Sequence, residues 1–181
     1  MEDDLCDGKY CGNYVLLTKL TNFTCSAERG IKEPVATFSA CFGAAFMPLH
    51  PTRYADLLRE KLYKHGAKVF LVNSGWSGGP YGVGKRMSIK TTRTCVDAIL
   101  DGSINDVEFI TDPVFGFEVP KHLPGLDDDG LVDPKRTWED KDAYDTTASK
   151  LAAMFHDNFE KYKGVGSIDY TQYGPTKVQI S

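Results

Sequence analysis

The chain has 181 residues, of which 41% are hydrophobic and 12% aromatic, so it is long enough to bury one sizeable core. Its net charge of -4 comes from 21 basic and 25 acidic residues mixed along the sequence, and no basic run is longer than a pair such as Lys85–Arg86, so nucleic acid is not an expected partner. No stretch approaches the ~18 apolar residues of a membrane span, and nothing near Met1 has the pattern of a secretory signal, so we expect a cytoplasmic protein with no membrane partner.

The first expected element is a helix over Pro51–His65, because proline suits a first helical position, apolar residues recur at helical spacing and Gly66 supplies a stop. Before it, residues 1–27 are expected to be a poorly ordered lead-in, within which the run Tyr14–Leu20 fits either a strand or a helix. After the helix, Lys68–Val72 is β-rich and flanked by turn residues, which predicts a buried strand.

Further along, a short strand over Arg86–Ile89 should lead into a helix capped by Thr91 or Thr92 and ended by Gly102. Two short strands are expected on either side of Asp112–Pro113. We expect the rest to comprise a loop over Pro120–Arg136, a last helix from a Thr137 cap to Tyr162 whose apolar stripe packs in the core, and a surface tail over 164–181. Together these elements predict an α/β fold with Lys68–Val72 central and the helices at 51–65 and 137–162 covering it.

The segment Leu71–Arg93 is the most informative, because five glycines in ten residues free the backbone to approach a phosphate or a ring. Gly79, Gly84 and Lys85 fit a phosphate loop in part, but Arg86 stands where that loop needs a hydroxyl to hold magnesium. The loop also leads into a strand and not into a helix amino terminus, where anions are normally held. Taken alone, the spacing is equally compatible with a glycine-rich hairpin that carries a solvated basic pair.

Four stretches of sequence, in this order, resemble ATP-dependent phosphoenolpyruvate carboxykinases. They are ATFSACFGAAFMPLHPTRYADLL (36–58), NSGWSGGPYGVGKRMSIKTTR (73–93), DPVFGFEVP (112–120) and TWEDKDAYDTTASKLAAMFHDNF (137–159). The resemblance covers residues 28–163 and corresponds to about the last third of that family's chain. The resemblance implies a partial carboxy-terminal, nucleotide-binding domain with a mixed sheet. Because upstream strands complete this domain in the family, it also implies that some apolar surface or sheet edge is left exposed. Leu16–Ala27 departs from the family pattern.

The resemblance implies a lyase that converts oxaloacetate and ATP into phosphoenolpyruvate, ADP and carbon dioxide in gluconeogenesis, with Mn²⁺ or Mg²⁺ stabilising the developing negative charge. In that family the phosphate loop, the metal ligands and the substrate-binding arginines precede the matched region. We therefore expect no catalytic residue and no metal ligand in this chain, dependence on a missing amino-terminal part of the enzyme, and no activity of the chain alone. The alternative is a non-catalytic remnant that binds nucleotide weakly or serves only as an interaction domain.

The same resemblance assigns the adenine end of ATP to three residues. Arg86 would lie along the base, the backbone of Met87 would contact it, and the Thr92 hydroxyl would bond nearby. A guanidinium plane suits stacking on an aromatic ring, and threonine can both donate and accept hydrogen bonds. From the residues alone, Thr92 fits a helix cap equally well.

The other chemically active residue types predict ordinary structural roles. The five cysteines have no disulfide spacing, the pair Cys6 and Cys11 lacks a second pair of zinc ligands, and Cys41 has no adjacent histidine that would mark a nucleophile. The run Asp127–Asp129 is consecutive, whereas calcium loops alternate their ligands, so a solvated turn is expected. The histidines are scattered and none is assigned a metal: His50, His65, His122 and His156.

Overall fold

The computed structural model describes residues 46–80, 82–166 and 168–176, without the side chain of Gln172. The predictions for the lead-in, for Tyr14–Leu20, for the first four cysteines and for the departure at Leu16–Ala27 lie outside these residues. The chain divides into two compact units. The described residues of the first are 46–69, 153–166 and 168–175, and those of the second are 70–80, 82–152 and 176. None of the helices formed by the described residues is long and apolar enough to cross a membrane.

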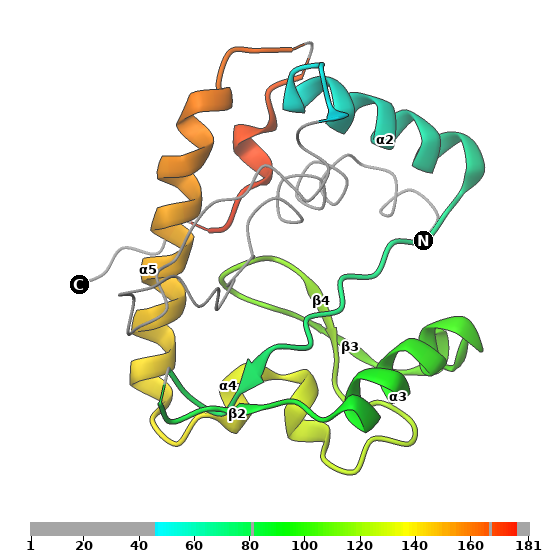
Figure 1. The fold of residues 1–181 in the computed structure, drawn as a ribbon, viewed down its shortest axis with the longest axis vertical. Helices are drawn as coiled ribbons and strands as arrows, with labels where there is room; N and C mark the ends of the chain where they lie inside the picture. The colour runs from blue at the N-terminus through cyan, green and yellow to red at the C-terminus, as the bar shows by residue number, and fades with distance from the viewer. Residues whose placement is uncertain (1–45, 81, 167, 177–181) are drawn as a thin grey trace. The chain divides into compact units, whose positions relative to one another are not determined.

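The first unit contains helix α2, Pro51–His65, which confirms the predicted helix at both ends (Figure 1). Its amino terminus is capped by His50, whose Nδ1 accepts from the Thr52 amide, and Gly66 ends it in the left-handed conformation at φ 60°. This conformation is strained for residues with a side chain, so glycine is the natural stop.

The core of the first unit forms where α2 meets the carboxy-terminal segment. Ala55 and Tyr170 are buried together and are surrounded by partly buried apolar side chains: Phe159, Tyr162, Ile168 and Tyr173. The Tyr170 hydroxyl donates to Asp56 Oδ1 at 2.6 Å. Two short 3₁₀ helices, Glu160–Tyr162 and Tyr170–Tyr173, shape this part of the chain. Tyr170 is thus a core residue within the segment for which we expected a surface course.

The predicted strand over Lys68–Val72 is wrong. No residue of this stretch pairs with another strand among the described residues, and Phe70, Leu71 and Val72 are 37%, 47% and 41% exposed. A strand exists only when a neighbour satisfies its backbone hydrogen bonds, and β-rich composition alone does not supply that neighbour. These residues do confirm the expectation that apolar surface is left exposed.

The second unit contains two antiparallel hairpins in place of a sheet centred on Lys68–Val72. In the first, β1 (Trp76–Ser77) pairs with β2 (Lys85–Arg86), so the predicted strand at Arg86 is real but shorter and shifted toward Lys85. In the second, β3 (Phe109–Thr111) pairs with β4 (Glu118–Pro120), which confirms the two strands predicted around Asp112–Pro113. The coarse α/β assignment holds, because helices and small sheets are combined in the described chain.

Helix α3, Ile89–Leu100, follows β2 and confirms the predicted helix, but its cap is Ser88 and not Thr91 or Thr92. The Ser88 hydroxyl accepts from the Thr91 amide at 3.0 Å, which places both threonines inside the first turn. The helix packs one face into a cluster formed by Ala98, Ile104 and Leu123, with six partly buried neighbours: Cys95, Ile99, Val107, Phe109, Leu126 and Val132. A 3₁₀ turn, Ser103–Asp106, follows the helix.

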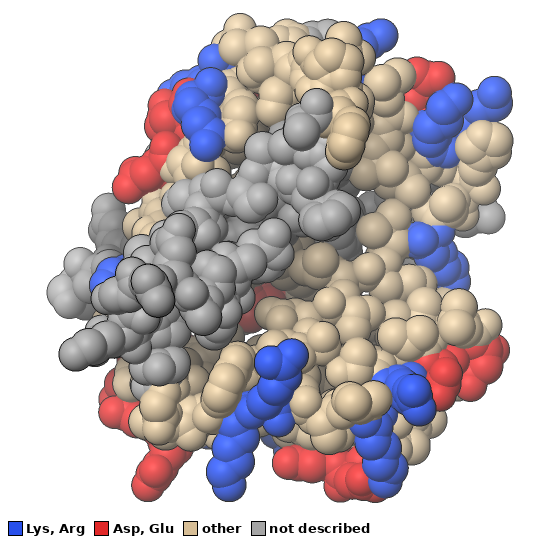
Figure 2. Space-filling model, viewed as in Figure 1, with Lys and Arg blue, Asp and Glu red and all other residues tan. Residues whose placement is uncertain are grey.

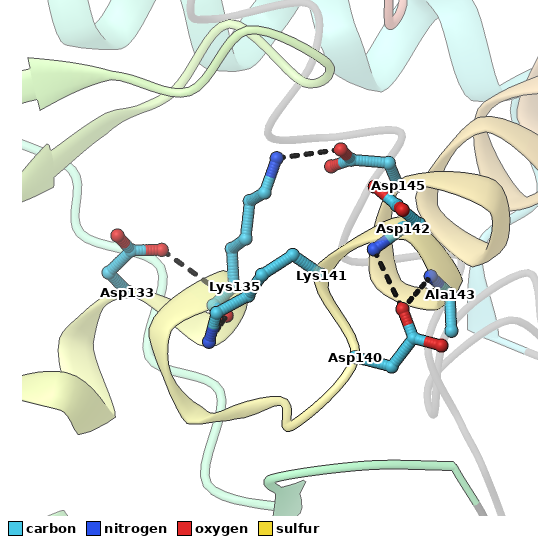
Figure 3. A network of polar contacts seen from close by, with 7 residues as sticks. All are labelled: Asp133, Lys135, Asp140, Lys141, Asp142, Ala143 and Asp145. Atoms are coloured by element: carbon cyan, nitrogen blue, oxygen red, sulfur yellow. Dashed lines mark hydrogen bonds and ion pairs between the residues drawn. The ribbon is translucent and has the colours of Figure 1, made fainter.

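The predicted loop over Pro120–Arg136 contains a 3₁₀ turn, Asp129–Val132, and the start of a short helix, α4 (Pro134–Thr137). The last helix, α5, runs over Lys141–Phe159, so the predicted cap at Thr137 is wrong. Asp140 takes the cap position, since its Oδ1 accepts from the amides of Asp142 and Ala143, both at 2.9 Å (Figure 3).

The apolar stripe of α5 packs in the core, as predicted. Ala148 and Ala152 are buried with Val114 in the second unit, and Tyr144 packs against this cluster. Phe155, in the part of the helix that belongs to the first unit, is 5% exposed. No residue of this stripe needs a cofactor to explain its burial.

Candidate functional site

The glycine-rich segment forms the hairpin β1–β2. Trp76 stands directly opposite Arg86 and Ser77 opposite Lys85, so the side chains of Trp76 and Arg86 lie on the same face of the hairpin. The Met87 amide extends the pairing, because it donates to the Gly75 carbonyl at 3.0 Å. The hairpin interpretation of this segment is therefore correct for the backbone.

The turn of this hairpin is closed by its own backbone. The amides of Val83 and Gly84 both donate to the Pro80 carbonyl at 3.0 Å, so these two donors are already used. A side chain at Gly84 would place its Cβ 2.6 Å from the Gly79 carbonyl oxygen, which explains why glycine stands there. Since the loop leads into β2 and not into a helix, the geometry differs from that of a phosphate loop.

Arg86, Met87 and Thr92 lie on the connection from β2 to the first turn of α3. Arg86 is exposed, and within the part of the chain that the structure describes its guanidinium makes no hydrogen bond or ion pair. The amide of Met87 is used by Gly75, which leaves its carbonyl oxygen as the backbone group for a ligand. The Thr92 hydroxyl donates to the Ser88 carbonyl at 3.3 Å and keeps its capacity to accept.

The hairpin is attached to α4 through Thr137, a residue that sequence reasoning placed at a helix cap. Its Oγ1 accepts from the Ser77 hydroxyl and from the Gly78 amide, both at 3.1 Å, and donates to the Pro134 carbonyl at 2.7 Å. No sequence signal could have revealed this contact, because about sixty residues separate its two sides.

The acidic run Asp127–Asp129 is used in three separate structural contacts. Asp127 pairs with Lys90 at 2.7 Å, and Asp128 caps the 3₁₀ turn by accepting from the Gly130 amide at 2.8 Å. Asp129 accepts from the Leu123 amide at 3.2 Å. The solvated turn predicted for this run is confirmed, since Asp127 and Asp128 are exposed and Asp129 is partly exposed.

The four histidines are placed separately. His50 caps α2, and His65 lies in its last turn. His156 Nε2 is 2.7 Å from the Pro175 carbonyl oxygen, and His122 Nδ1 is 3.5 Å from Asp129 Oδ1. Within the described residues, no group of three or more His, Cys, Asp or Glu side chains is arranged to hold a metal ion.

Two side chains of the second unit have raised pKa values. Burial raises the pKa of the Cys95 thiol, which disfavours a reactive thiolate there. Burial, reinforced by the negative charges of Asp112, Asp133 and Asp145, raises the pKa of Tyr144 to about 12. Neither side chain lies on the connection between β2 and α3.

Charges of both signs are interspersed on the face shown in Figure 2. Lys135 and Asp145 form one of the ion pairs, with Lys135 Nζ 2.7 Å from Asp145 Oδ2 (Figure 3). Both side chains are about half exposed, so this pair contributes little to stability.

The family model described as phosphoenolpyruvate carboxykinase matches residues 10–129 of the chain. Several curated relatives carry the name phosphoenolpyruvate carboxykinase (ATP). That of Campylobacter lari is 58% identical over 152 residues, which are 84% of this chain and 29% of the relative. That of Sulfurimonas denitrificans is 53% identical over 163 residues, 90% of this chain and 31% of the relative. That of Thermus thermophilus is 49% identical over 162 residues, 90% of this chain and 30% of the relative.

The chain thus spans about three tenths of the length of the curated relatives it matches. The match with the family model covers 120 consecutive residues, including α2, the glycine-rich hairpin, α3 and the hairpin β3–β4. From this match and these identities it follows that the chain belongs to the phosphoenolpyruvate carboxykinase (ATP) family.

Proposed function

We propose that this chain supplies the adenine-binding part of the ATP site of a phosphoenolpyruvate carboxykinase. The reaction breaks the carbon–carbon bond that releases carbon dioxide from oxaloacetate, and the enolate oxygen left behind takes the γ-phosphoryl group of ATP, giving phosphoenolpyruvate and ADP. The setting is gluconeogenesis in the cytoplasm. Family membership supports this proposal, and so does the exposed guanidinium of Arg86, which follows a glycine-rich turn and has no hydrogen bond or ion pair with any described residue.

Arg86 stacks on the adenine ring in this proposal. Its planar, permanently charged group suits an aromatic face, and the paired strand below it limits where its backbone can move. The Met87 carbonyl oxygen is an acceptor that matches the exocyclic amine of adenine. Thr92 adds a hydroxyl from the first turn of α3. These three residues bind and orient ATP, and none of them takes part in bond breaking.

The divalent cation of the reaction, Mn²⁺ or Mg²⁺, would stabilise charge on the phosphates and on the enolate. The described residues do not offer a fitting set of ligands, so we assign none of them to the metal. In our proposal the metal ligands, the phosphate-binding loop and the oxaloacetate site belong to an amino-terminal part of the enzyme. That part, in the same chain or as a separate fragment, is the partner on which activity depends.

The first test compares the 181-residue chain with a reconstituted enzyme. In the reconstituted enzyme, this chain replaces the matching part of the Campylobacter lari relative and is joined to the part that precedes it. With oxaloacetate, ATP and Mn²⁺, we expect phosphoenolpyruvate from the reconstituted enzyme and none from the chain alone. If the chain alone produced more phosphoenolpyruvate than a no-protein control, this would contradict our proposal that the catalytic groups belong to the amino-terminal part.

The second test replaces Arg86 with alanine in the reconstituted enzyme. A cation–π contact of about 1–2 kcal/mol corresponds to a rise of about five- to thirtyfold in the KM for ATP. Because the adenine end is remote from the transferred phosphate, kcat should change little. Arg59→Ala, which removes another exposed arginine, is the matched control and should leave both constants unchanged.

An unchanged KM for ATP in Arg86→Ala would refute the adenine assignment. A reconstituted enzyme that folds but gives no product, together with weak ATP binding by the chain, would instead favour a non-catalytic remnant. The two results are distinguishable, because the first concerns one residue of an active enzyme and the second concerns the activity itself.

A further inference from the structure

Among the described residues, the hydrogen bonds between the glycine-rich hairpin and α4 are all made by a single hydroxyl. Thr137 Oγ1 accepts two hydrogen bonds, from the Ser77 hydroxyl and the Gly78 amide, and donates one to the Pro134 carbonyl. A hydroxyl has one donor and two acceptor sites, so Thr137 is fully used. The two hydrogen bonds that Thr137 accepts are partly buried, both at 3.1 Å, and the one that it donates is short, at 2.7 Å. Removing the hydroxyl would leave the Gly78 amide without its acceptor.

The position of Ser77 and Gly78 is passed on to Arg86 by the hairpin itself. Ser77 is paired with Lys85, and the adjacent pair joins Trp76 to Arg86. The turn between the strands is tight, because Gly84 approaches the Gly79 and Ser77 carbonyls too closely for any side chain. We expect a hairpin this short and closed to move as one piece, so that its attachment point determines where Arg86 is presented.

The segment that carries Thr137 is held in turn by Lys141. Its ammonium group donates to three carbonyl oxygens at the end of α4: those of Lys135 at 2.9 Å, Arg136 at 3.0 Å and Trp138 at 2.5 Å. These carbonyls flank Thr137 on both sides, and a helix end leaves such acceptors without intrahelical partners. Figure 3 shows Lys141 and Lys135 side by side at the end of α4. Lys141 therefore holds the segment around Thr137 through contacts that do not involve the hairpin.

We propose that Thr137 is a positioning residue for ATP: by fixing Ser77 and Gly78, its hydroxyl sets the place of Arg86 on the adenine ring. This inference rests on the proposed function, since it assumes that Arg86 contacts the base. Thr137 itself does not touch ATP. Its contribution reaches the nucleotide only through the hairpin.

The test measures the KM for ATP and kcat of the reconstituted enzyme with Thr137→Val and Thr137→Ser. Valine keeps the shape and removes the hydroxyl, so we expect the KM for ATP to rise about three- to tenfold with kcat nearly unchanged. Serine restores the hydroxyl, so we expect less than about a twofold rise. Thr147→Val is the matched control. The Thr147 hydroxyl donates to the Ala143 carbonyl within α5 and has no other hydrogen bond to a described residue, so both constants should stay at their original values.

A double substitution separates this inference from the proposed function. If Thr137 acts through Arg86, then Thr137→Val should add little to the KM for ATP once Arg86 is alanine. An additive effect, or no effect of Thr137→Val in an enzyme that does respond to Arg86→Ala, would overturn the inference and leave the adenine assignment intact. No effect of Arg86→Ala itself would refute the proposed function.

Amide hydrogen exchange of the 181-residue chain tests the attachment without any activity. Thr137→Val should speed exchange at Gly78 and at Met87, whose amide closes the strand pairing, and Thr137→Ser should preserve their protection. Equal exchange in all variants would overturn the inference. If Thr137→Val does not fold, Ser77→Ala removes one of the two bonds to Thr137 and should raise the KM for ATP about twofold.

Discussion

Thr92 has a single hydroxyl proton, and it is directed to the Ser88 carbonyl at 3.3 Å. In the proposed ATP site, the oxygen would therefore act mainly as an acceptor. In the reconstituted enzyme, Thr92→Val should raise the KM for ATP about two- to tenfold, a milder effect than that of Arg86→Ala, because one neutral hydrogen bond contributes about 1 kcal/mol. Thr92→Ser keeps the oxygen and should behave like the original enzyme. A KM that is the same with valine and with threonine would exclude Thr92 from the site.

Tyr144 is another residue whose surroundings predict a measurable property. It is half-buried beside Trp138, with ring centroids 5.6 Å apart, and burial with nearby carboxylates raises its pKa to about 12. The folded state thus favours the protonated phenol, whose ordinary pKa is 10.0. The stabilisation is fully present below the ordinary value and is lost as the pH rises from about 10 to about 12.

We therefore expect the free energy of unfolding, measured with urea, to fall more steeply over this pH interval in the original chain than in Tyr144→Phe. Phenylalanine keeps the ring packing and removes the titrating group. Tyr63→Phe, which removes an exposed phenol from α2, is the matched control. Equal slopes in the original chain and Tyr144→Phe would show that Tyr144 does not titrate differently in the folded state.

The hairpin β1–β2 makes its own prediction at the scale of an element. A Cβ at position 84 would stand 2.6 Å from the Gly79 carbonyl oxygen and 3.1 Å from that of Ser77, and both are backbone atoms that cannot move alone. Gly84→Ala should therefore open the hairpin, with a cost of about 1–3 kcal/mol, and should speed amide exchange at Met87.

Gly75→Ala is a matched control in the same hairpin. Its Cβ would meet only Asn73 Oδ1, at an ordinary 3.5 Å, and its backbone is not in the left-handed region. Alanine there should be neutral or slightly stabilising, because it restricts the unfolded chain. Similar exchange rates at Met87 in both variants would contradict the close approach at Gly84.

For the whole molecule, the consecutive exposed residues Phe70, Leu71 and Val72 predict how the purified chain behaves. Neighbouring apolar side chains in water form a binding surface for a hydrophobic dye and favour self-association. Leu71→Lys should lower both dye fluorescence and the concentration dependence of sedimentation. Leu100→Lys, at a more exposed position on α3, should change them less, because Leu100 does not belong to such a run. A larger effect of Leu100→Lys would show that Phe70–Val72 is not the main apolar surface that binds the dye.

The sequence by itself determined the elements whose signals are local. The helix over Pro51–His65 could be predicted to the residue, because proline, the apolar spacing and Gly66 all act within one helix length. The strands around Asp112–Pro113 could be predicted for the same reason, since their turn and their pairing lie within twelve residues. Family membership was also readable from the sequence, because four long stretches matched in order.

Only the tertiary structure decided the outcomes that depend on distant partners. Lys68–Val72 has the composition of a strand, but it belongs to neither of the sheets formed by the described residues. Thr137 is a residue type that often caps helices, but its hydroxyl accepts hydrogen bonds from Ser77 and Gly78 instead, and Asp140 caps α5. In each case the residue type shows which hydrogen bonds can form. The partner in those hydrogen bonds is determined by packing between segments far apart in the sequence, which no local pattern encodes.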